Sequence, residues 1–167
     1  MKAYEVIRDA TSSDSGMIAE IYNDYILNTA ITFEEKRVSS AEINDRLGRV
    51  QGSGLPWIVA IENSAVLGYA YAVKWKDRSA YRFAAEMTVY LAADAQGKGI
   101  GTSLYKELLT RLRDNDIQTV IGGVTLPNPA SIALHEKVGM KKVAHFEKVG
   151  FKFNRWHDVG YWQLNFI

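Results

Sequence analysis

Apolar residues recur at helical spacing in several segments of this chain. Ser13 or Asp14 can cap a first helix, Ser39-Ser40-Ala41-Glu42 is a capping-box pattern for a second, and Pro129 suits the first turn of a fourth that Gly139 ends. The predicted buried faces are Met17, Ile18, Ile21, Tyr22, Tyr25 and Ile26 in the first helix, Ile43, Leu47 and Val50 in the second, and Ile100, Leu104, Leu108, Leu109 and Leu112 in the third.

Between these helices, shorter runs of β-branched and aromatic residues predict strands. The predicted strands are Tyr4 to Arg8, Trp57 to Glu62, Ala65 to Val73, Ala84 to Leu91, Thr119 to Leu126, Lys141 to Lys148 and Asp158 to Phe166. Asn63-Ser64 is a hairpin signal between the second and third of them. The order is β-α-α-β-β-β-α-β-α-β-β without a linker or a repeat, which predicts one α/β domain spanning 1–167.

Composition narrows the range of functions. The chain has 167 residues, of which 47% are hydrophobic and 23% charged, as in a soluble globular protein. It has no cysteine, which excludes a disulfide framework, a thiolate metal site and a cysteine nucleophile, and is compatible with a cytoplasmic location. The three histidines lack paired metal-ligand spacing, the net charge of +1 gives little reason to expect nucleic acid, and no apolar run has the length of a membrane span or signal peptide. We therefore expect no metal and a small-molecule ligand.

The stretch from Val89 to Tyr105 carries the clearest chemical signal, because a β-like run breaks into a glycine-rich turn and then opens a helix. Converging backbone amides and the positive end of a helix dipole make such a turn a site for phosphate or pyrophosphate. Gly97, Gly99 and Gly101 alternate, so the spacing fits neither a Walker loop nor a dinucleotide fingerprint. On its own the pattern is also compatible with an ordinary strand-to-helix turn.

Gln96-x-x-Gly99-x-Gly101 resembles the pyrophosphate-binding motif of the GCN5-related N-acetyltransferases (GNATs), and the order of predicted elements is similar to that of the family. The resemblance implies a mixed, mostly antiparallel sheet with about four helices, in which the strand before the glycine loop, the fourth, splays from the fifth. It also implies acetyl-coenzyme A as the acetyl donor, with its pantetheine arm paired to the backbone of strand residues. The cofactor-binding residues that it implies are Val89, Tyr90, Leu91, Gln96, Gly97, Lys98, Gly99, Ile100, Gly101, Thr102 and Asn128.

The segment from Asn128 to Gly139 looks like a later segment of the same family, in which an asparagine precedes a helix and a glycine ends it. Most members carry a tyrosine in that helix, which is the usual candidate to protonate the leaving thiolate. This chain has His135 instead. His135 can be a general acid, a residue that acts behind the reacting groups, or a helix residue that faces substrate, because its pKa allows either charge state.

Three further segments look like the phosphinothricin and methionine sulfoximine N-acetyltransferase branch: Thr32 to Glu34, Trp75 to Tyr90, and Asn154 to Leu164. Substrates of that branch are small α-amino acids with a second polar head group, and the resemblance implies a homodimer. Lys76, Arg78 and Tyr81 offer donors for such anions, although a run of this kind is by itself typical of an exposed loop. Phe33 and Trp75 either wall the pocket or belong to the core.

Glu86 is the predicted general base for the incoming amine, and this role requires a raised pKa through partial burial. The alternative is a glutamate on the solvent face of a strand. A backbone N–H near Leu91 is the predicted oxyanion donor, with direct transfer in a ternary complex. Transfer to another amine (an aminoglycoside, a polyamine or a protein N-terminus) and a non-catalytic acyl-coenzyme A sensor are competing hypotheses.

Overall fold

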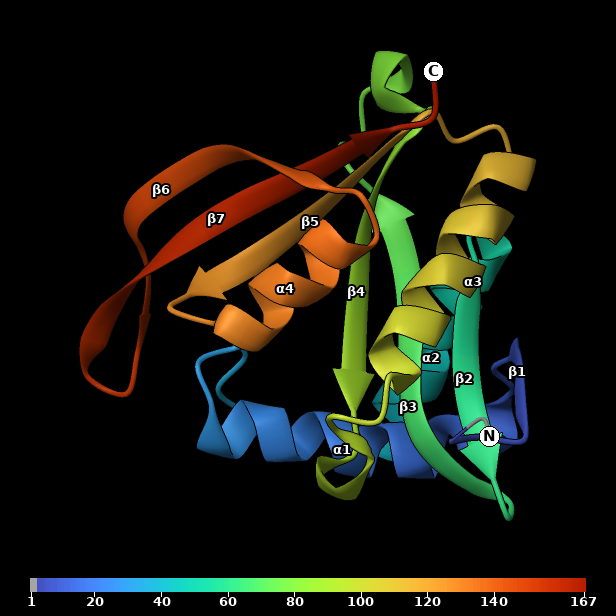
Figure 1. The fold of residues 1–167 in the computed structure, drawn as a ribbon. Helices are drawn as coiled ribbons and strands as arrows, with labels where there is room; N and C mark the ends of the chain where they lie inside the picture. The colour runs from blue at the N-terminus through green and yellow to red at the C-terminus, as the bar shows by residue number, and fades with distance from the viewer. Residues whose placement is uncertain (1–2) are drawn as a thin grey trace.

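A mixed sheet of seven strands forms the centre of the molecule in the computed structural model, which describes residues 3–167 (Figure 1). The strands are β1 (Val6–Asp9), β2 (Trp57–Glu62), β3 (Ala65–Lys74), β4 (Ala84–Leu91), β5 (Thr119–Leu126), β6 (Lys141–Lys152) and β7 (Arg155–Asn165). Their spatial order is β1-β2-β3-β4-β5-β7-β6, and every pair is antiparallel except β4 and β5. The predicted fold class is confirmed.

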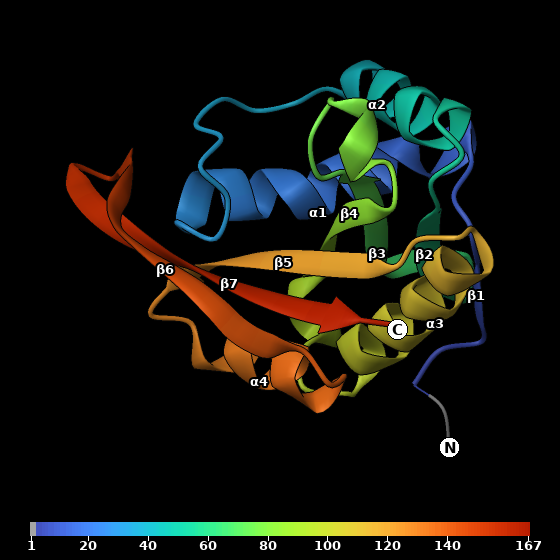
Figure 2. The same ribbon diagram turned by 90° about the horizontal axis from the view of Figure 1, so that it is seen from above.

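Four α-helices cover the two faces of the sheet (Figure 2), within the same described residues. They are α1 (Ser15–Asn28), α2 (Ser40–Gly52), α3 (Ile100–Asp114) and α4 (Pro129–Lys137). Helices α1 and α2 pack together on one face, and α3 and α4 lie on the other. None of these helices is both long and apolar enough to cross a membrane.

The core forms where the predicted apolar faces meet the central strands. Strand β2 is buried on both faces from Trp57 to Ile61, and Ile100, Leu104 and Leu108 of α3 are fully buried against the sheet. Burying each such side chain contributes about 1.5–3 kcal/mol to folding. The apolar run of β2 therefore encodes a strand covered on both sides, and the rigid sheet that results carries the site.

The sheet divides where β4 and β5 diverge. Their parallel pairing covers three positions only, from Ala84 opposite Thr119 to Glu86 opposite Ile121. Beyond Glu86, β4 continues to Leu91 paired with β3 alone, while β5 continues to Leu126 paired with β7 alone. The strands move apart as they continue (Figure 1), and the predicted splay is confirmed. Unpaired backbone groups therefore line the inner edges of two half-sheets.

The final hairpin is longer than predicted. The sequence indicated strands over 141–148 and 158–166, whereas β6 and β7 together form an arm that turns at Phe153 and Asn154, both with positive φ. Bulky apolar side chains near this turn, such as Val149 and Phe151, lie exposed on the arm, whereas the alternate positions Gly150 and Lys152 are buried, so the buried face of the outer half carries no apolar side chains that would mark it. Figure 1 shows the arm projecting beyond the helices. The first strand also begins at Val6 rather than Tyr4.

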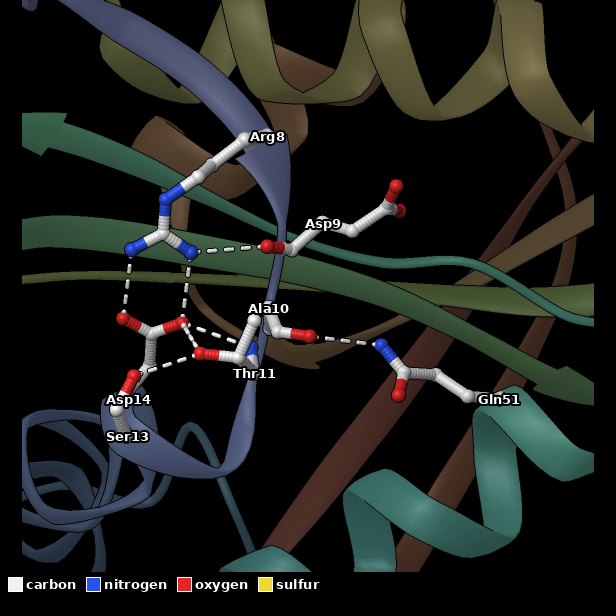
Figure 3. A network of polar contacts seen from close by, with 7 residues as sticks. All are labelled: Arg8, Asp9, Ala10, Thr11, Ser13, Asp14 and Gln51. Carbon is white, nitrogen blue, oxygen red and sulfur yellow. Dashed lines mark hydrogen bonds and ion pairs between the residues drawn. The ribbon is translucent and has the colours of Figure 1, made fainter.

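A buried carboxylate joins β1 to the start of α1 (Figure 3). Asp14 accepts two hydrogen bonds from the Arg8 guanidinium, at 2.8 and 2.9 Å, and one from the Thr11 amide at 2.8 Å. Asp14 precedes α1, as predicted for a capping residue, but its side chain makes no cap hydrogen bond to that helix. Gln51 of α2 donates to the Ala10 carbonyl at 2.8 Å, so β1, α1 and α2 are held together at this corner.

Candidate active site

Two connected hollows occupy the splay between β4 and β5. The first is a cavity of about 250 Å³ that contains Glu86, Thr88, Tyr105 and His135 in its lining, and the second is a groove of about 390 Å³ along the glycine loop. Ile31, Val89 and Ser131 line both. A molecule that extends along the groove can therefore present its end to the cavity.

Glu86 lies in the cavity at the last paired position before the strands diverge. Its side chain is half-buried, and no other residue in the described range 3–167 donates a hydrogen bond to its carboxylate. Burial raises the pKa of Glu86, and the positive charge of Lys76 partly opposes this shift. Glu86 therefore has the environment that a proton acceptor for an amine requires, and it does not lie on an open solvent face.

His135 of α4 also lines the cavity, but its two ring nitrogens are already engaged. Nδ1 lies 2.7 Å from the Ser131 carbonyl, so Nδ1 carries the proton, and Nε2 accepts from the Tyr105 hydroxyl at 3.2 Å. Burial lowers the pKa of His135, which keeps the ring neutral. In this tautomer Nε2 carries no proton and its lone pair accepts from Tyr105, so the arrangement does not fit the general-acid alternative.

Tyr105 of α3 is a site residue that the sequence interpretation missed. It is almost fully buried, burial raises its pKa, and its hydroxyl donates to His135. A methyl group at Gly122 of β5 would overlap the His135 ring, so the close approach of the strand backbone also fixes that ring. The only sequence signal for Tyr105 was an aromatic residue beside the apolar face of a helix, and this pattern normally indicates core.

The glycine loop forms the wall of the groove beside the start of α3. Gly97 and Gly99 both have positive φ, of 73° and 81°, and Gly99 is the N-cap residue of the helix. A helix N-terminus presents free amides and a positive dipole end, which fits a pyrophosphate. Gln96, Gly101 and Thr102 also line the groove, whereas Lys98 does not, and the side chain of Ile100 is in the core. Among the predicted loop residues, Ile100 can therefore contribute only through its backbone.

The inner edge of β4 is engaged by a tyrosine that the sequence interpretation assigned to the core. The Tyr25 hydroxyl donates to the Leu91 carbonyl at 2.8 Å and accepts from the Leu91 amide at 3.3 Å and from Gln96 Nε2 at 3.3 Å. The predicted oxyanion donor, the Leu91 amide, thus points into the groove and has a hydroxyl partner there. Tyr25 lines the groove as well.

Backbone alternation separates the three strand residues that were predicted to pair with a cofactor. The Ala92 amide donates to the Leu67 carbonyl of the strand on the other side, so the backbone groups of Val89 and Leu91 face the splay and those of Tyr90 face β3. The prediction for Tyr90 is therefore wrong, because its amide and carbonyl belong to the β3–β4 ladder. Its ring is buried among other tyrosines.

Asn128 is the N-cap residue of α4. Its Oδ1 accepts from the Ser131 amide at 3.1 Å, and the residue also lines the groove. Since its side-chain oxygen is used by the cap, the Asn128 amide nitrogen is the part left for a ligand in the groove. The capping contact also holds Ser131 and, through it, the orientation of His135.

The predicted substrate residues separate into two groups. Phe33 lines the cavity, and Trp75 packs edge-on against Tyr161, another lining residue, with ring centroids 5.7 Å apart. Lys76 lies with Nζ 4.8 Å from the Trp75 ring centroid, and its charge acts on Glu86. Arg78 and Tyr81, in contrast, are exposed on the loop between β3 and β4 and do not line the cavity. Of the five residues only Phe33 lines the cavity; Trp75 and Lys76 act on it through the lining residues Tyr161 and Glu86, and Arg78 and Tyr81 have no such contact among the described residues.

Comparison with known proteins agrees with this geometry. The family model described as "Acetyltransferase (GNAT) domain" matches residues 7–160. Phosphinothricin N-acetyltransferase of Streptomyces viridochromogenes is 37% identical over 160 residues, and the match covers 96% of this chain and 87% of the relative. A methionine sulfoximine/methionine sulfone acetyltransferase of Salmonella typhimurium is 34% identical, and the match covers 95% of this chain and 92% of the relative. A phosphinothricin acetyltransferase from Sinorhizobium meliloti, solved with acetyl-coenzyme A, superposes with a TM-score of 0.93 at 38% identity, covering 96% of this chain and 87% of that one.

Proposed function

This chain belongs to the acetyltransferase (GNAT) family, and we propose that it transfers the acetyl group of acetyl-coenzyme A to the α-amino group of a small amino-acid analogue such as phosphinothricin or methionine sulfoximine. The observation that carries the proposal is the position of Glu86. Its half-buried carboxylate, with a raised pKa, lies in the cavity that continues the groove. A proton acceptor is thus placed where the end of a donor molecule and an amine would meet.

The groove fits the donor. The amides of the glycine loop and of the first turn of α3 would take the pyrophosphate, and the inner backbone edge at Val89 and the Leu91 carbonyl would pair with the pantetheine arm as an added strand does. Gly101, Thr102 and Asn128 line the remaining walls. The named relatives include one solved with acetyl-coenzyme A, which supports the same donor for this chain.

Direct transfer in a ternary complex accounts for the chemistry. The α-ammonium loses a proton to Glu86, directly or through water, and the freed nitrogen pair attacks the thioester carbonyl carbon. A C–N bond forms, the C–S bond breaks, and coenzyme A leaves as a thiolate that takes up a proton to become the thiol. A covalent intermediate on a cysteine is excluded because the chain has none.

Charge that develops on the thioester oxygen needs a donor, and the Leu91 amide is the proposed one. This amide points into the groove and donates to the Tyr25 hydroxyl at 3.3 Å, so the thioester oxygen would replace that hydroxyl as its partner. The Tyr105–His135 pair borders the same cavity and holds a neutral imidazole near the reacting groups. We assign His135 to orienting the Tyr105 hydroxyl, whose oxygen can accept a hydrogen bond from the acceptor amine.

An anionic acceptor suits the cavity better than a polycation. The positive charge of Lys76 acts on Glu86 from outside the cavity and would attract a carboxylate or phosphinate, while Phe33 and Tyr161 supply rigid aromatic walls and Trp75 packs against Tyr161. The small volume of about 250 Å³ is suited to a compact amino acid. An aminoglycoside would need a larger acidic pocket.

We also propose that the protein is a cytoplasmic homodimer. Val149, Phe151, Phe153 and Trp156 are each at least half exposed on the β6–β7 arm, and exposed apolar surface of this kind marks association sites. The lack of cysteine accords with a reducing compartment. Light scattering on the purified protein should give twice the chain mass of 18.7 kDa, and a monomer at micromolar concentration would contradict the dimer.

The test of the activity is release of free thiol from acetyl-coenzyme A over a panel of acceptors: phosphinothricin, methionine sulfoximine, methionine sulfone, common amino acids and an aminoglycoside. We expect turnover of one or more of the first three. Turnover of the aminoglycoside alone would replace the proposed acceptor with an aminoglycoside. Tight binding of acetyl-coenzyme A with no thiol release from any acceptor would favour a non-catalytic sensor.

A further inference from the structure

A buried lysine near the tip of the arm contacts the segment that forms one wall of the cavity. Lys152 of β6 is only 2% exposed, and its ammonium donates to the carbonyls of Ile26, at 2.7 Å, and Thr32, at 2.9 Å. Burial lowers the pKa of Lys152, and the nearby charges of Glu35 and Glu34 oppose this shift. An ammonium withdrawn from water in this way is costly unless hydrogen bonds replace its hydration, so the two carbonyls are essential partners.

These two carbonyls belong to the end of α1 and to the loop that follows it. Ile26 is in the last turn of α1, where carbonyls lack helical partners and a positive charge is favourable. Thr32 lies in the loop 29–39, which carries Ile31, Thr32 and Phe33 to the cavity. The Thr32 hydroxyl is bonded to Tyr22 at 2.8 Å, so this residue is held from both sides. Lys152 thus ties the first part of the loop to the last turn of α1.

A second contact joins the same two segments. The Phe33 ring lies so close to the Gly150 backbone of β6 that a methyl group there would overlap the ring. His157 of β7 lies beside Phe33, with ring centroids 6.1 Å apart, and its Nε2 donates to the Lys152 carbonyl at 3.1 Å. The tip of the arm therefore holds both the backbone of the loop and the aromatic side chain that the loop presents to the cavity.

From these contacts we infer that Lys152 is a positioning residue, which holds the loop 29–39 against the arm and so sets the acceptor-side wall of the cavity. The inference rests on the proposed acetyl transfer, because the wall matters only if an acceptor binds there. Within residues 3–167, the Lys152 ammonium makes no hydrogen bond to Glu86, to the glycine loop or to the start of α3. Loss of Lys152 should therefore affect the acceptor far more than the donor.

The test is the Lys152→Met variant, with Lys141→Met as the matched control, since Lys141 is an exposed lysine at the other end of the same strand. With methionine sulfoximine as acceptor, we expect Lys152→Met to raise the acceptor KM about tenfold, with kcat and the KM for acetyl-coenzyme A changed about twofold or less. Lys152→Arg should recover part of the acceptor KM. Equal losses toward both substrates would reduce Lys152 to a general structural role and overturn the inference.

Gly150→Ala provides an independent test if Lys152→Met does not fold. The added methyl group displaces the Phe33 ring without altering Lys152, so the acceptor KM should again rise selectively, while Gly48→Ala, where a methyl group meets open space, should not change it. Hydrogen exchange of residues 29–35 should accelerate in Lys152→Met or Gly150→Ala but not in the controls. Unchanged exchange would refute the positioning role even if wild-type protein transferred no acetyl group, an outcome that would count against the proposed function separately.

Discussion

Replacing Glu86 with glutamine changes the proposed base and almost nothing else. Glutamine has nearly the same size and shape, and no hydrogen bond from residues 3–167 to the Glu86 carboxylate is lost. A positioned general base is worth roughly 10²–10⁴-fold in rate. Because water can accept the proton when the carboxylate is absent, though less well, we expect kcat to fall by about 10²–10³-fold, which is about 2.7–4 kcal/mol of activation free energy.

The assay is thiol release at saturating acceptor, with acetyl-coenzyme A affinity measured separately by calorimetry. Glu86 does not line the groove, so Glu86→Gln should bind the donor within about twofold of wild type, the range expected for a residue outside the binding surface. The wild-type kcat/KM should rise with pH through the raised pKa of Glu86, because only the carboxylate accepts a proton. Lys76→Met removes the charge that lowers this pKa, and the acidic limb should then move to higher pH.

A Glu86→Gln protein that keeps a third or more of wild-type kcat would refute the assignment of the base. So would an acidic limb that persists unchanged in the variant, since the titrating group would then be elsewhere. Loss of donor binding together with activity would mean that the substitution has disturbed the fold. Glu86→Asp, which keeps the carboxylate charge but shortens the side chain, would then separate the effect of the charge from that of its position.

Three further predictions concern fold and site. Asp14→Asn should lower the free energy of unfolding by about 1–2 kcal/mol at pH 7. Burial, the largest single influence, raises the Asp14 pKa, but the hydrogen bonds from Arg8 and Thr11 and the charge of Arg8 together lower it below its ordinary value, so the stabilisation is present at neutral pH and is lost as the pH falls through the lowered pKa. Urea titrations at pH 7 and pH 3 check this, and an equal deficit at both would contradict it. Gly99→Ala forces a side chain to a φ of 81° and should weaken acetyl-coenzyme A binding in calorimetry, whereas Gly16→Ala should not. Gly122→Ala crowds His135 and should lower kcat by at least about tenfold, a loss of about 1.4 kcal/mol; normal turnover would show that the ring position is unimportant.

The elements predicted best are those whose apolar pattern is dictated by burial. The bounds of β2, β4 and β5 agree with the predicted strands because each is packed on the sheet interior. The length of the β6–β7 arm was underestimated, because Phe151 and Trp156 lie exposed there and no element of the described chain covers them. A pattern of apolar residues reports burial, and it is uninformative where apolar side chains face outward.

The site was predicted less completely than the fold because side-chain roles depend on which segments meet. Tyr25 and Tyr105 have the spacing of core residues, and nothing local distinguishes their hydroxyl partners. A lysine in a strand is normally expected to face solvent, because lysines are rarely buried, so the sequence gives no sign that Lys152 is buried. Arg78 and Tyr81 were assigned to the substrate by segment resemblance, and the direction taken by the loop between β3 and β4 leaves both outside the cavity.

The splay between β4 and β5 also bears on aggregation. Strand edges with unpaired amides and carbonyls ordinarily recruit strands from other chains. Here the two inner edges face a groove with walls from α1 and α4, through Tyr25 and Leu134. A polypeptide strand that carries bulky side chains on both faces would meet these walls, whereas a thin, unbranched chain would not. The unpaired backbone groups of β4 and β5 therefore remain accessible to a slender ligand, while strands of neighbouring proteins cannot pair with them.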